Sequence, residues 1–388
     1  MSNDPAWKFR RMHPGEMNID PIESEFFSTE VLGSLADALV REAIQNSLDA
    51  RAGGEPARVR FAFSSPAAML EGDQAERYLA GLREHLAADR AGIAQPPPPG
   101  EPLSFLVLED FGTRGLQGDP GQSEDEEIGA AGVRNDFYYF WRNVGRSRKQ
   151  SSDLGRWGLG KTVFPAASRI NAFFALTVRR DDGRRLLMGQ AVLRIHKLDG
   201  ARYYPYGYFG GFRGDFALPV DDAEVIDTFR QDFGVARSRE PGLSVVIPYP
   251  DPDLTPEAVL PSVVRHYFLP ILAGDLVVEV VRDGRAETLD ARTVMRLVES
   301  LGGGEGARLQ PLVELARWGL DLAAERFLKL PEPPSGAAPR WGADEGLDQA
   351  LAPLRRQFAT GERIALRVPV WVKPANADAA LASFDVFL

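Results

Sequence analysis

The spacing of apolar residues predicts helices and strands along most of the chain. Leucine, valine, isoleucine and alanine recur at helical intervals over Leu32–Ile44, after the capping sequence Ser28–Glu30. Strict alternation over 58–64 predicts a half-buried strand, and a second amphipathic helix is expected over 74–90. The apolar run 103–108, followed by two acidic residues, is typical of a buried strand.

The same patterns continue toward the C-terminus. Further helices are predicted over 162–169, 256–269, 291–301 and 309–328. Further strands are predicted over 172–179, 186–196, 243–248, 276–282 and 363–372, and the first three are expected to share one mixed sheet. The final run 383–388 is strand-like and has no polar finish, so we expect the natural chain to continue beyond Leu388.

Breaks in these patterns divide the chain. Residues 1–27 contain prolines and scattered aromatic residues without a helical or strand period, and they are predicted to form an extended arm. Prolines and acidic residues cluster after Tyr249, which indicates a boundary at residue 250. We therefore expect a larger domain over 28–250 and a smaller α/β domain over 251–388.

Composition narrows the possible classes of protein. The 388 residues are 44% hydrophobic and 26% charged and include no cysteine, which excludes a disulfide scaffold, a cysteine nucleophile and an iron–sulfur cluster. Lysine and arginine number 45 against 55 acidic residues, a net charge of −10, so a DNA contact is not supported by the bulk charge and would need a local patch. Apolar runs are far shorter than the ~20 residues of a membrane span, so we expect a cytoplasmic protein without a membrane partner.

The apolar stripe of the first predicted helix becomes polar in its second half. The leucines within 32–39 are followed on the same helical face by Glu42, Asn46 and Asp49. Burying two carboxylates and a carboxamide is costly unless something pairs with them. The pattern indicates a site for a cation or polar ligand; the alternative is a helix end that emerges into water.

Two glycine-containing segments carry further candidate chemistry. Asp110 ends a predicted strand and is followed by Gly112 and Gly115, which places an acceptor beside backbone that a flat ligand can approach, although an ordinary turn has the same pattern. The sequence GRWGLGKT at 155–162 offers backbone N–H groups to phosphate oxygens ahead of a helix. It also satisfies the P-loop pattern, but the polar residues before Gly155 show no strand period.

The order of these three motifs resembles the Bergerat fold of the GHKL superfamily, which includes gyrase, heat-shock-type chaperone, histidine-kinase and mismatch-repair ATPases. The pattern E-x-x-x-N-S-x-D-A spans Glu42–Ala50, a strand then ends in D-x-G, and the long segment 117–154 precedes G-x-x-G-x-G. The resemblance covers about residues 28–250 and implies an α/β fold, an α+β sandwich with helices covering a mixed sheet. By position alone, 251–388 corresponds to a transducer-like domain.

The resemblance implies ATP and Mg²⁺ as cofactors and slow hydrolysis to ADP and phosphate. Glu42 would be the general base, Asn46 would complete the coordination of Mg²⁺, and Asp49 would lie behind them. Asp110 would accept a hydrogen bond from the adenine amino group, and 117–154 would be the ATP lid. The other implied ATP-binding residues are Gly112, Gly115, Gly155, Gly158, Leu159, Gly160, Lys161 and Thr162.

Two departures separate this chain from the family pattern. The family has D-x-G-x-G, whereas Asp110–Gly115 is one residue longer. The later Gly-Thr strand motif falls at 242–244, where Leu243 replaces the threonine and Ser244 is the candidate substitute hydroxyl.

The resemblance also implies partners. We expect a homodimer on ATP binding, with the arm crossing to the second protomer, and a protein partner subunit, in a protein resembling the prokaryotic microrchidia-like ATPases of DNA transactions or antiviral defence. A histidine kinase is disfavoured because His13, the histidine upstream of the motifs, lies in a predicted turn. Basic residues at 142–149 are expected to close over ATP phosphates or a partner subunit, with nucleic acid as the alternative. The competing function is an ATP-sensing interaction module that does not hydrolyse ATP.

Overall fold

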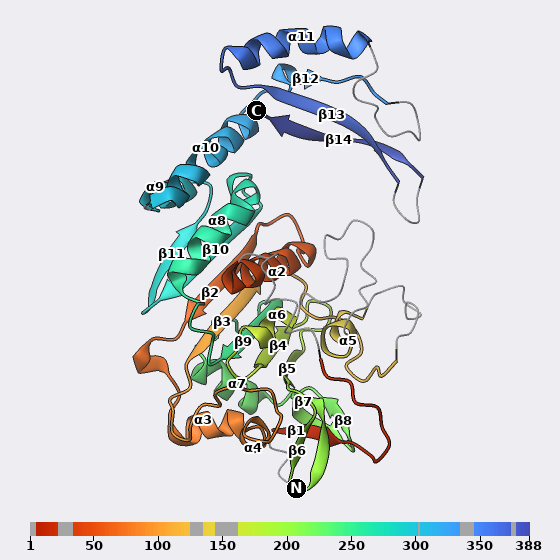
Figure 1. The fold of residues 1–388 in the computed structure, drawn as a ribbon, viewed down its shortest axis with the longest axis vertical. Coiled ribbons are helices and arrows are strands. Elements are labelled where there is room, and N and C mark those ends of the chain that lie inside the picture. Colours follow the sequence, from red (N-terminus) through yellow and green to blue (C-terminus); the bar gives the residue numbers. More distant parts are fainter. Residues whose placement is uncertain are drawn as a thin grey trace.

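A large, mostly antiparallel sheet forms the body of the molecule (Figure 1). The computed structural model describes residues 5–21, 34–124, 135–143, 162–301, 303–333, 345–373 and 378–388. The described strands follow the order β1-β7-β5-β4-β9-β3-β2-β10-β11, and β6 and β8 pair with β7. They are β1 (Ala6–Arg11), β2 (Ala57–Phe63), β3 (Phe105–Phe111), β4 (Ala172–Val178), β5 (Arg185–Val192), β6 (His196–Leu198), β7 (Ala201–Arg213), β8 (Phe216–Leu218), β9 (Gly242–Pro248), β10 (Leu276–Arg282) and β11 (Arg285–Leu289).

Helices cover both faces of this sheet, each over its own apolar core. One face is covered by α2 (Leu35–Asp49), α5 (Asp136–Trp141), α6 (Val163–Ala166) and α8 (Pro256–Leu272), and the other by α3 (Gly72–Leu79), α4 (Arg83–Leu86) and α7 (Ala223–Asp232). Alternate residues of β3 enter the two cores, which is why its sequence is almost continuously apolar. The mixed sheet and its helices confirm the expected α/β fold class.

Helix α2 begins with a capping box. The Ser34 hydroxyl accepts a hydrogen bond of 3.1 Å from the backbone N–H of Asp37, and the Asp37 carboxylate accepts one of 3.2 Å from the backbone N–H of Ser34. The cap expected at 28–30 lies outside the described residues. Leu39, Val40 and Ile44 are fully buried in the core between α2 and the sheet.

No strand is predicted within the extended arm, but residues 6–11 form an edge strand. β1 pairs antiparallel with β7, where Trp7 lies opposite Phe209. Trp7 and Phe9 are buried in the second core and alternate with exposed Lys8 and Arg10. This short alternation is a strand signal that the surrounding prolines obscured. The described part of the arm packs on its own chain.

The single helix expected over 74–90 is wrong, since α3 and α4 are separate. Gly81 lies between them with φ +79°, and a Cβ there would come within 2.8 Å of the Trp7 carbonyl oxygen. The helix is therefore interrupted at Gly81, where the backbone of the edge strand β1 lies close to the chain.

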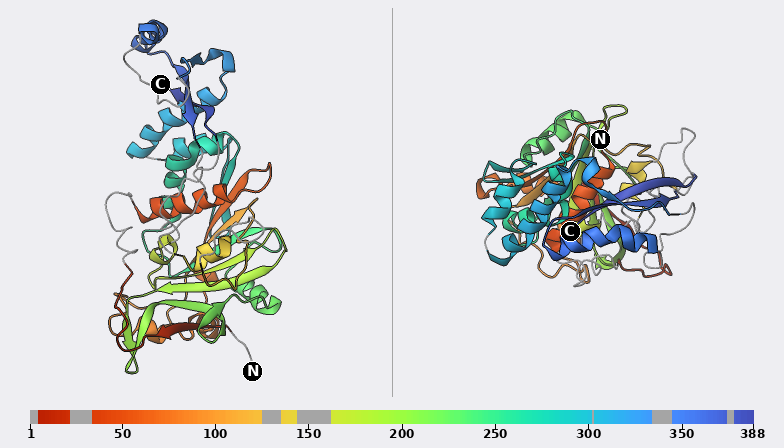
Figure 2. Two further views of the ribbon diagram at one scale, coloured as in Figure 1. Left: turned by 90° about the vertical axis from the view of Figure 1, so that its right-hand side faces the viewer. Right: turned by 90° about the horizontal axis from the view of Figure 1, so that it is seen from above.

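The large sheet continues past residue 250. Helix α8 leads into β10, which pairs in parallel with β2, and β11 then forms the edge. The division into domains at residue 250 stays a prediction. A second sheet, far from the N-terminus in Figure 2, follows helices α9 and α10. The elements of this part are α9 (Val294–Ser300), α10 (Gly303–Leu320), β12 (Leu328–Lys329), α11 (Glu345–Ala359), β13 (Ala365–Val372) and β14 (Ala380–Phe387). Within the described ranges, every helix is too short or too polar to span a membrane.

Candidate functional site

Helix α2 presents its polar residues one turn apart. The side-chain amide of Asn46 donates a hydrogen bond of 2.8 Å from Nδ2 to Oε1 of Glu42. Both side chains are half-buried, as is Asp49 one turn further on. The amide nitrogen of Asn46 thus faces the carboxylate, and its oxygen Oδ1 is the atom suited to a hard cation.

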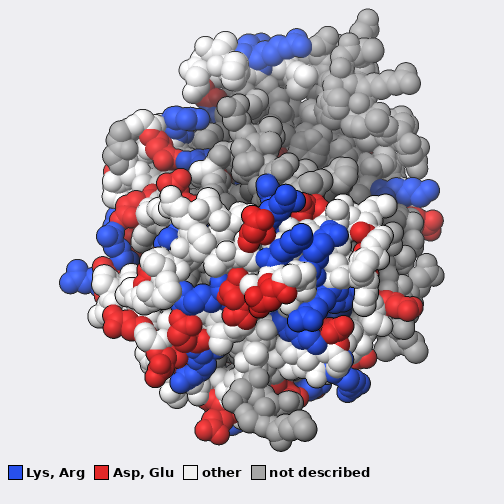
Figure 3. All heavy atoms as spheres, turned by 60° about the horizontal axis from the view of Figure 1, so that its bottom comes forward, with Lys and Arg blue, Asp and Glu red and all other residues white. Residues whose placement is uncertain are grey.

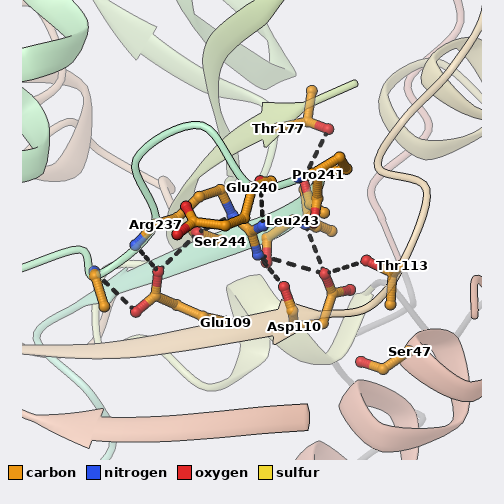
Figure 4. A network of polar contacts seen from close by, with 12 residues as sticks. Ser47, Glu109, Asp110, Thr113, Thr177, Arg237, Glu240, Pro241, Leu243 and Ser244 are labelled. Carbon is orange, nitrogen blue, oxygen red and sulfur yellow. Dashed lines mark hydrogen bonds and ion pairs between the residues drawn. The ribbon is translucent and has the colours of Figure 1, made fainter. Parts of the chain in front are cut away.

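Asp110 lies within β3 rather than after it, and its carboxylate is fixed on one side (Figure 4). Its Oδ1 accepts hydrogen bonds of 2.7 Å from the backbone N–H of Leu243 and 2.7 Å from the hydroxyl of Thr113. Arg237 lies 3.5 Å from the same oxygen. Among the described residues, the hydrogen bonds to this carboxylate all reach Oδ1, which leaves Oδ2 as the acceptor for a ligand.

A buried arginine supports this carboxylate from behind. The guanidinium of Arg237 is 0% exposed and donates to the backbone carbonyl oxygens of Asp110, Leu243, Glu240 and Pro241. Burial raises the pKa of the Asp110 carboxyl, and the positive charge of Arg237 acts in the opposite direction. The sequence analysis missed Arg237, because its partners are far away in the chain.

The neighbouring acid, Glu109, completes the network. Its Oε1 accepts hydrogen bonds of 3.0 Å from the Arg237 backbone N–H and 3.0 Å from the Ser244 hydroxyl. Its Oε2 accepts from Arg60 at 2.8 Å and from the backbone N–H of Ala236 at 3.0 Å. Both carboxylate oxygens are satisfied, so Glu109 is a structural anchor beside Asp110.

The hydroxyl beside Asp110 belongs to Thr113, so the assignment of Ser244 to that role is wrong. Ser244 is opposite Glu109 in the β3–β9 pairing and donates to that residue instead. Thr113 comes from the six-residue stretch that departs from the family spacing. The longer turn directly after β3 therefore supplies the missing hydroxyl.

Three glycines allow the close packing around Asp110. Gly112 has φ +76°, and a Cβ there would come within 3.0 Å of the Pro56 carbonyl oxygen. Gly115 has φ +70°, and a Cβ there would collide with the carbonyl oxygen of Val178 on β4. At Gly242 a Cβ would lie 2.5 Å from Oδ1 of Asp110. Side chains at these positions would displace the carboxylate or its turn.

Backbone hydrogen bonds join the first two motifs. The N–H of Ala52 donates to the carbonyl of Gly112 at 2.9 Å, and the N–H of Arg114 donates to the carbonyl of Ala50 at 3.0 Å. The Arg114 guanidinium also donates to the carbonyl of Asp49 at 3.0 Å. The end of α2 and the turn after β3 therefore form one rigid junction.

Helix α5, within the expected lid, packs on the same face of the sheet. Arg114 contacts Asp136 of this helix at 3.1 Å, and Trp141 stacks on Phe173 with 5.5 Å between ring centroids. The guanidinium of Arg142 donates to the carbonyl oxygens of Pro120 and Ala217 at 2.7 and 2.8 Å. These bonds fix the C-terminal end of α5, and the closing role expected for Arg142 stays a prediction.

The third motif lies almost entirely outside the described residues. Gly155, Gly158, Leu159, Gly160 and Lys161 fall in this part, and their roles stay predictions. Thr162 is buried and immediately precedes α6, whose residues pack against α2 and β4. The chain thus returns to the α2 face directly after the motif.

Comparison with solved structures identifies similar folds. The ATPase region of Saccharomyces cerevisiae topoisomerase II bound to dexrazoxane matches 68% of this chain and 52% of its own, at 12% identity and a TM-score of 0.32. A second structure of that ATPase region matches 64% and 48%, at 12% identity and a TM-score of 0.29. The ATPase and transducer domains of DNA topoisomerase II from Balamuthia mandrillaris match 69% and 51%, at 11% identity and a TM-score of 0.32.

These matches set the extent of the similarity. The chain spans about half the length of the solved chains that it matches. No family model and no curated protein sequence matches it.

Proposed function

We propose that this chain binds ATP with Mg²⁺ and slowly hydrolyses it to ADP and phosphate. The observation that carries the proposal is the junction between α2 and the turn after β3. It places the Asp110 carboxylate, with Oδ1 fixed and Oδ2 left as an acceptor, close to the helix that bears Glu42 and Asn46. An adenine acceptor and a pair suited to metal-assisted hydrolysis thus belong to one rigid unit.

Asp110 is suited to recognise the base. A carboxylate oxygen accepts the hydrogen bond of an exocyclic amino group, and the fixed Oδ1 sets the direction of Oδ2. Gly112, with no side chain, lets a flat ring lie against the backbone. An amino purine therefore fits this position, and a keto purine would place an acceptor against the carboxylate.

Asn46 and Glu42 are suited to the phosphate end. Mg²⁺ takes oxygen ligands and is usually held by few protein groups together with substrate phosphates. The carboxamide oxygen of Asn46 is one such protein ligand. When bound, the cation would neutralise phosphate charge. Glu42, oriented by the Asn46 amide, would accept a proton from the attacking water as general base.

The pairing of the central strands favours this reading over a P-loop enzyme. A P-loop connects a buried strand to a helix, typically in a parallel βαβ arrangement. Here the pairings among β5, β4, β9, β3 and β2 are all antiparallel. Lys161 is then an additional phosphate contact rather than the lysine of a P-loop.

We also propose that ATP binding and hydrolysis control the association of the chain with a second protein. Closure of 117–154 over ATP would favour a homodimer or engagement of a partner subunit, and hydrolysis would release it. DNA transactions or antiviral defence would be the setting for such a switch. These steps follow from the resemblance to the superfamily.

Substitution of Glu42 tests hydrolysis separately from binding. We expect Glu42→Ala to retain ATP affinity and to lose phosphate release, because the general base acts after binding. If the unsubstituted chain binds ATP and releases no phosphate, the protein is an ATP sensor.

A comparison of Asn46→Ala with Lys161→Ala tests whether the nucleotide site is of the Bergerat or the P-loop type. Loss of binding only in Lys161→Ala would contradict the Bergerat site and support a P-loop.

A further inference from the structure

Several surface charges at the end of the molecule that carries β1 are paired within the chain. Figure 3 shows clusters of basic side chains there with acidic ones beside them. Lys8 of β1 pairs with Asp215 at 2.8 Å, and Arg77 of α3 pairs with Asp232 at 3.0 Å. Because these charges are already compensated, they do not mark a docking surface. A more specific arrangement lies between the helices α2 and α8.

Helix α8 lies beside α2 (Figure 1) and is kinked. Tyr267 has non-helical backbone angles, φ −134° and ψ 15°, within this helix. Pro270, three residues later, has no N–H for the carbonyl oxygen of His266, and its ring crowds that oxygen. The proline therefore accounts for the break in the helix directly after His266.

The kink brings three consecutive side chains of α8 to α2. Arg265 and His266 contact Oδ1 of Asp37 at 2.6 and 3.0 Å. The Tyr267 hydroxyl donates a hydrogen bond of 2.6 Å to the carbonyl oxygen of Arg41, one turn further along α2. In a regular helix, three consecutive side chains point in directions spread over about 200° and do not all face one neighbouring helix. The kink therefore lets Tyr267 reach α2 next to the contacts with Asp37.

The contacts next to Tyr267 are firmly held. Oδ1 of Asp37 also accepts a hydrogen bond of 2.8 Å from the hydroxyl of Ser262, and Arg265 extends to Glu305 of α10. These hydrogen bonds lower the pKa of Asp37 to about 2 against the effect of burial, so its carboxylate stays charged at neutral pH. The position of the half-buried Tyr267 side chain is thus set by bonds on both sides of the kink.

The bond from Tyr267 meets α2 at the turn that carries the proposed general base. Arg41 directly precedes Glu42, and its carbonyl oxygen is the one that the N–H of Gln45 binds in a regular α-helix. Burial raises the pKa of the Tyr267 hydroxyl, and the negative charges of Glu42 and Asp49 raise it further, against the positive charge of Arg41. The Tyr267 hydroxyl therefore lies within electrostatic reach of Glu42.

We propose that Tyr267 is a positioning residue for Glu42 in ATP hydrolysis. Its hydroxyl holds the turn of α2 from which Glu42 and Asn46 project, and so keeps their mutually bonded side chains aligned for the attacking water. Recognition of the adenine by Asp110 does not depend on this bond. The inference rests on the proposed hydrolysis, so its test includes a readout that needs no nucleotide.

Tyr267→Phe removes the hydroxyl and keeps the ring. We expect kcat for phosphate release to fall about fivefold, the size of one hydrogen bond, with the KM for ATP nearly unchanged, because the base acts after binding. Pro270→Ala, which permits a regular helix, should lower kcat to a similar extent. Tyr249→Phe is the matched control, since the Tyr249 hydroxyl also donates to a carbonyl oxygen, that of Glu101, at 3.1 Å, and this variant should keep its kcat.

Hydrogen exchange of the nucleotide-free chain provides the second readout. Peptides covering residues 41–49 should exchange faster in Tyr267→Phe than in Tyr249→Phe, because this turn of α2 loses its bond to α8. If the unsubstituted chain releases no phosphate, the proposed hydrolysis fails, and the exchange over 41–49 alone decides whether Tyr267 holds α2.

Three results would overturn the inference. The first is a kcat in Tyr267→Phe equal to that of the unsubstituted chain. The second is equal exchange over 41–49 in Tyr267→Phe and Tyr249→Phe. The third is an equal loss of kcat in these two variants, which would assign the effect to general destabilisation.

Discussion

Thr113 donates a hydrogen bond of 2.7 Å to Oδ1 of Asp110 from a turn that is one residue longer than the family pattern. With the backbone N–H of Leu243, it holds one oxygen of the carboxylate in place. The departure in sequence is therefore compensated within the same turn. This relationship makes Thr113 a positioning residue for the proposed adenine contact.

Removing the Thr113 hydroxyl should weaken ATP binding. Thr113→Val keeps the shape of the buried side chain but loses the donor, and we expect about a fivefold loss of affinity, the size of one hydrogen bond. Thr113→Ser should restore affinity. Isothermal calorimetry with ATP measures both variants. Equal affinities for Thr113→Val and the unsubstituted chain would show that the bond does not position Asp110.

Removing the buried charge of Arg237 should destabilise the fold. Arg237→Met leaves Asp110 without its buried counter-charge, and breaking such a pair costs roughly 3–5 kcal/mol. Urea denaturation of the full chain gives the change in free energy of unfolding. Arg184→Met is the matched control, because the Arg184–Asp221 pair is exposed and should contribute less than about 1 kcal/mol. Equal losses in both variants would contradict the network.

Asp37 should make stability depend on acid pH. Burial acts to raise its pKa, but hydrogen bonds from Ser262, Ser34 and His266 outweigh burial and lower the pKa to about 2. The folded state therefore favours the carboxylate, which contributes roughly 2 kcal/mol above the unfolded pKa of about 4. This contribution is lost as the pH falls from about 4 through 2.

The variant Asp37→Asn should be less stable at neutral pH and should lose less stability between pH ~4 and ~2. Unfolding free energies measured across this range give the difference between the two chains. Asp253→Asn, at an exposed position, is the control. Parallel pH profiles for the unsubstituted chain and Asp37→Asn would contradict the depressed pKa.

Local patterns predicted most elements of the fold but not how they combine. The strand expected over 58–64 is observed at 57–63, and the one expected over 276–282 has the same bounds. Nothing in either run indicates that β10 pairs in parallel with β2. That pairing depends on how α8 returns the chain to the sheet, which is a non-local property.

Two pairs of polar residues show that contacts between side chains far apart in the chain could not be predicted either. His85 and His196 have no ligand spacing in the sequence, yet Nδ1 of the first lies 2.7 Å from Nε2 of the second in the second core. Burial lowers the pKa of His85 to about 4. Likewise, the motif containing Asp110 was recognised from local spacing, whereas Arg237 could not be, since the two residues are 127 positions apart in the chain.

The most direct test of the central claim is the affinity of the full chain for ATP, with and without Mg²⁺, compared with that of Asp110→Asn. Calorimetry measures binding, and phosphate release is followed in the same samples. We expect Mg²⁺-dependent binding that weakens roughly tenfold or more in Asp110→Asn, because a hydrogen bond to a charged group is lost. Unchanged affinity in Asp110→Asn, or no binding of ATP by the unsubstituted chain, would contradict the proposed ATP site.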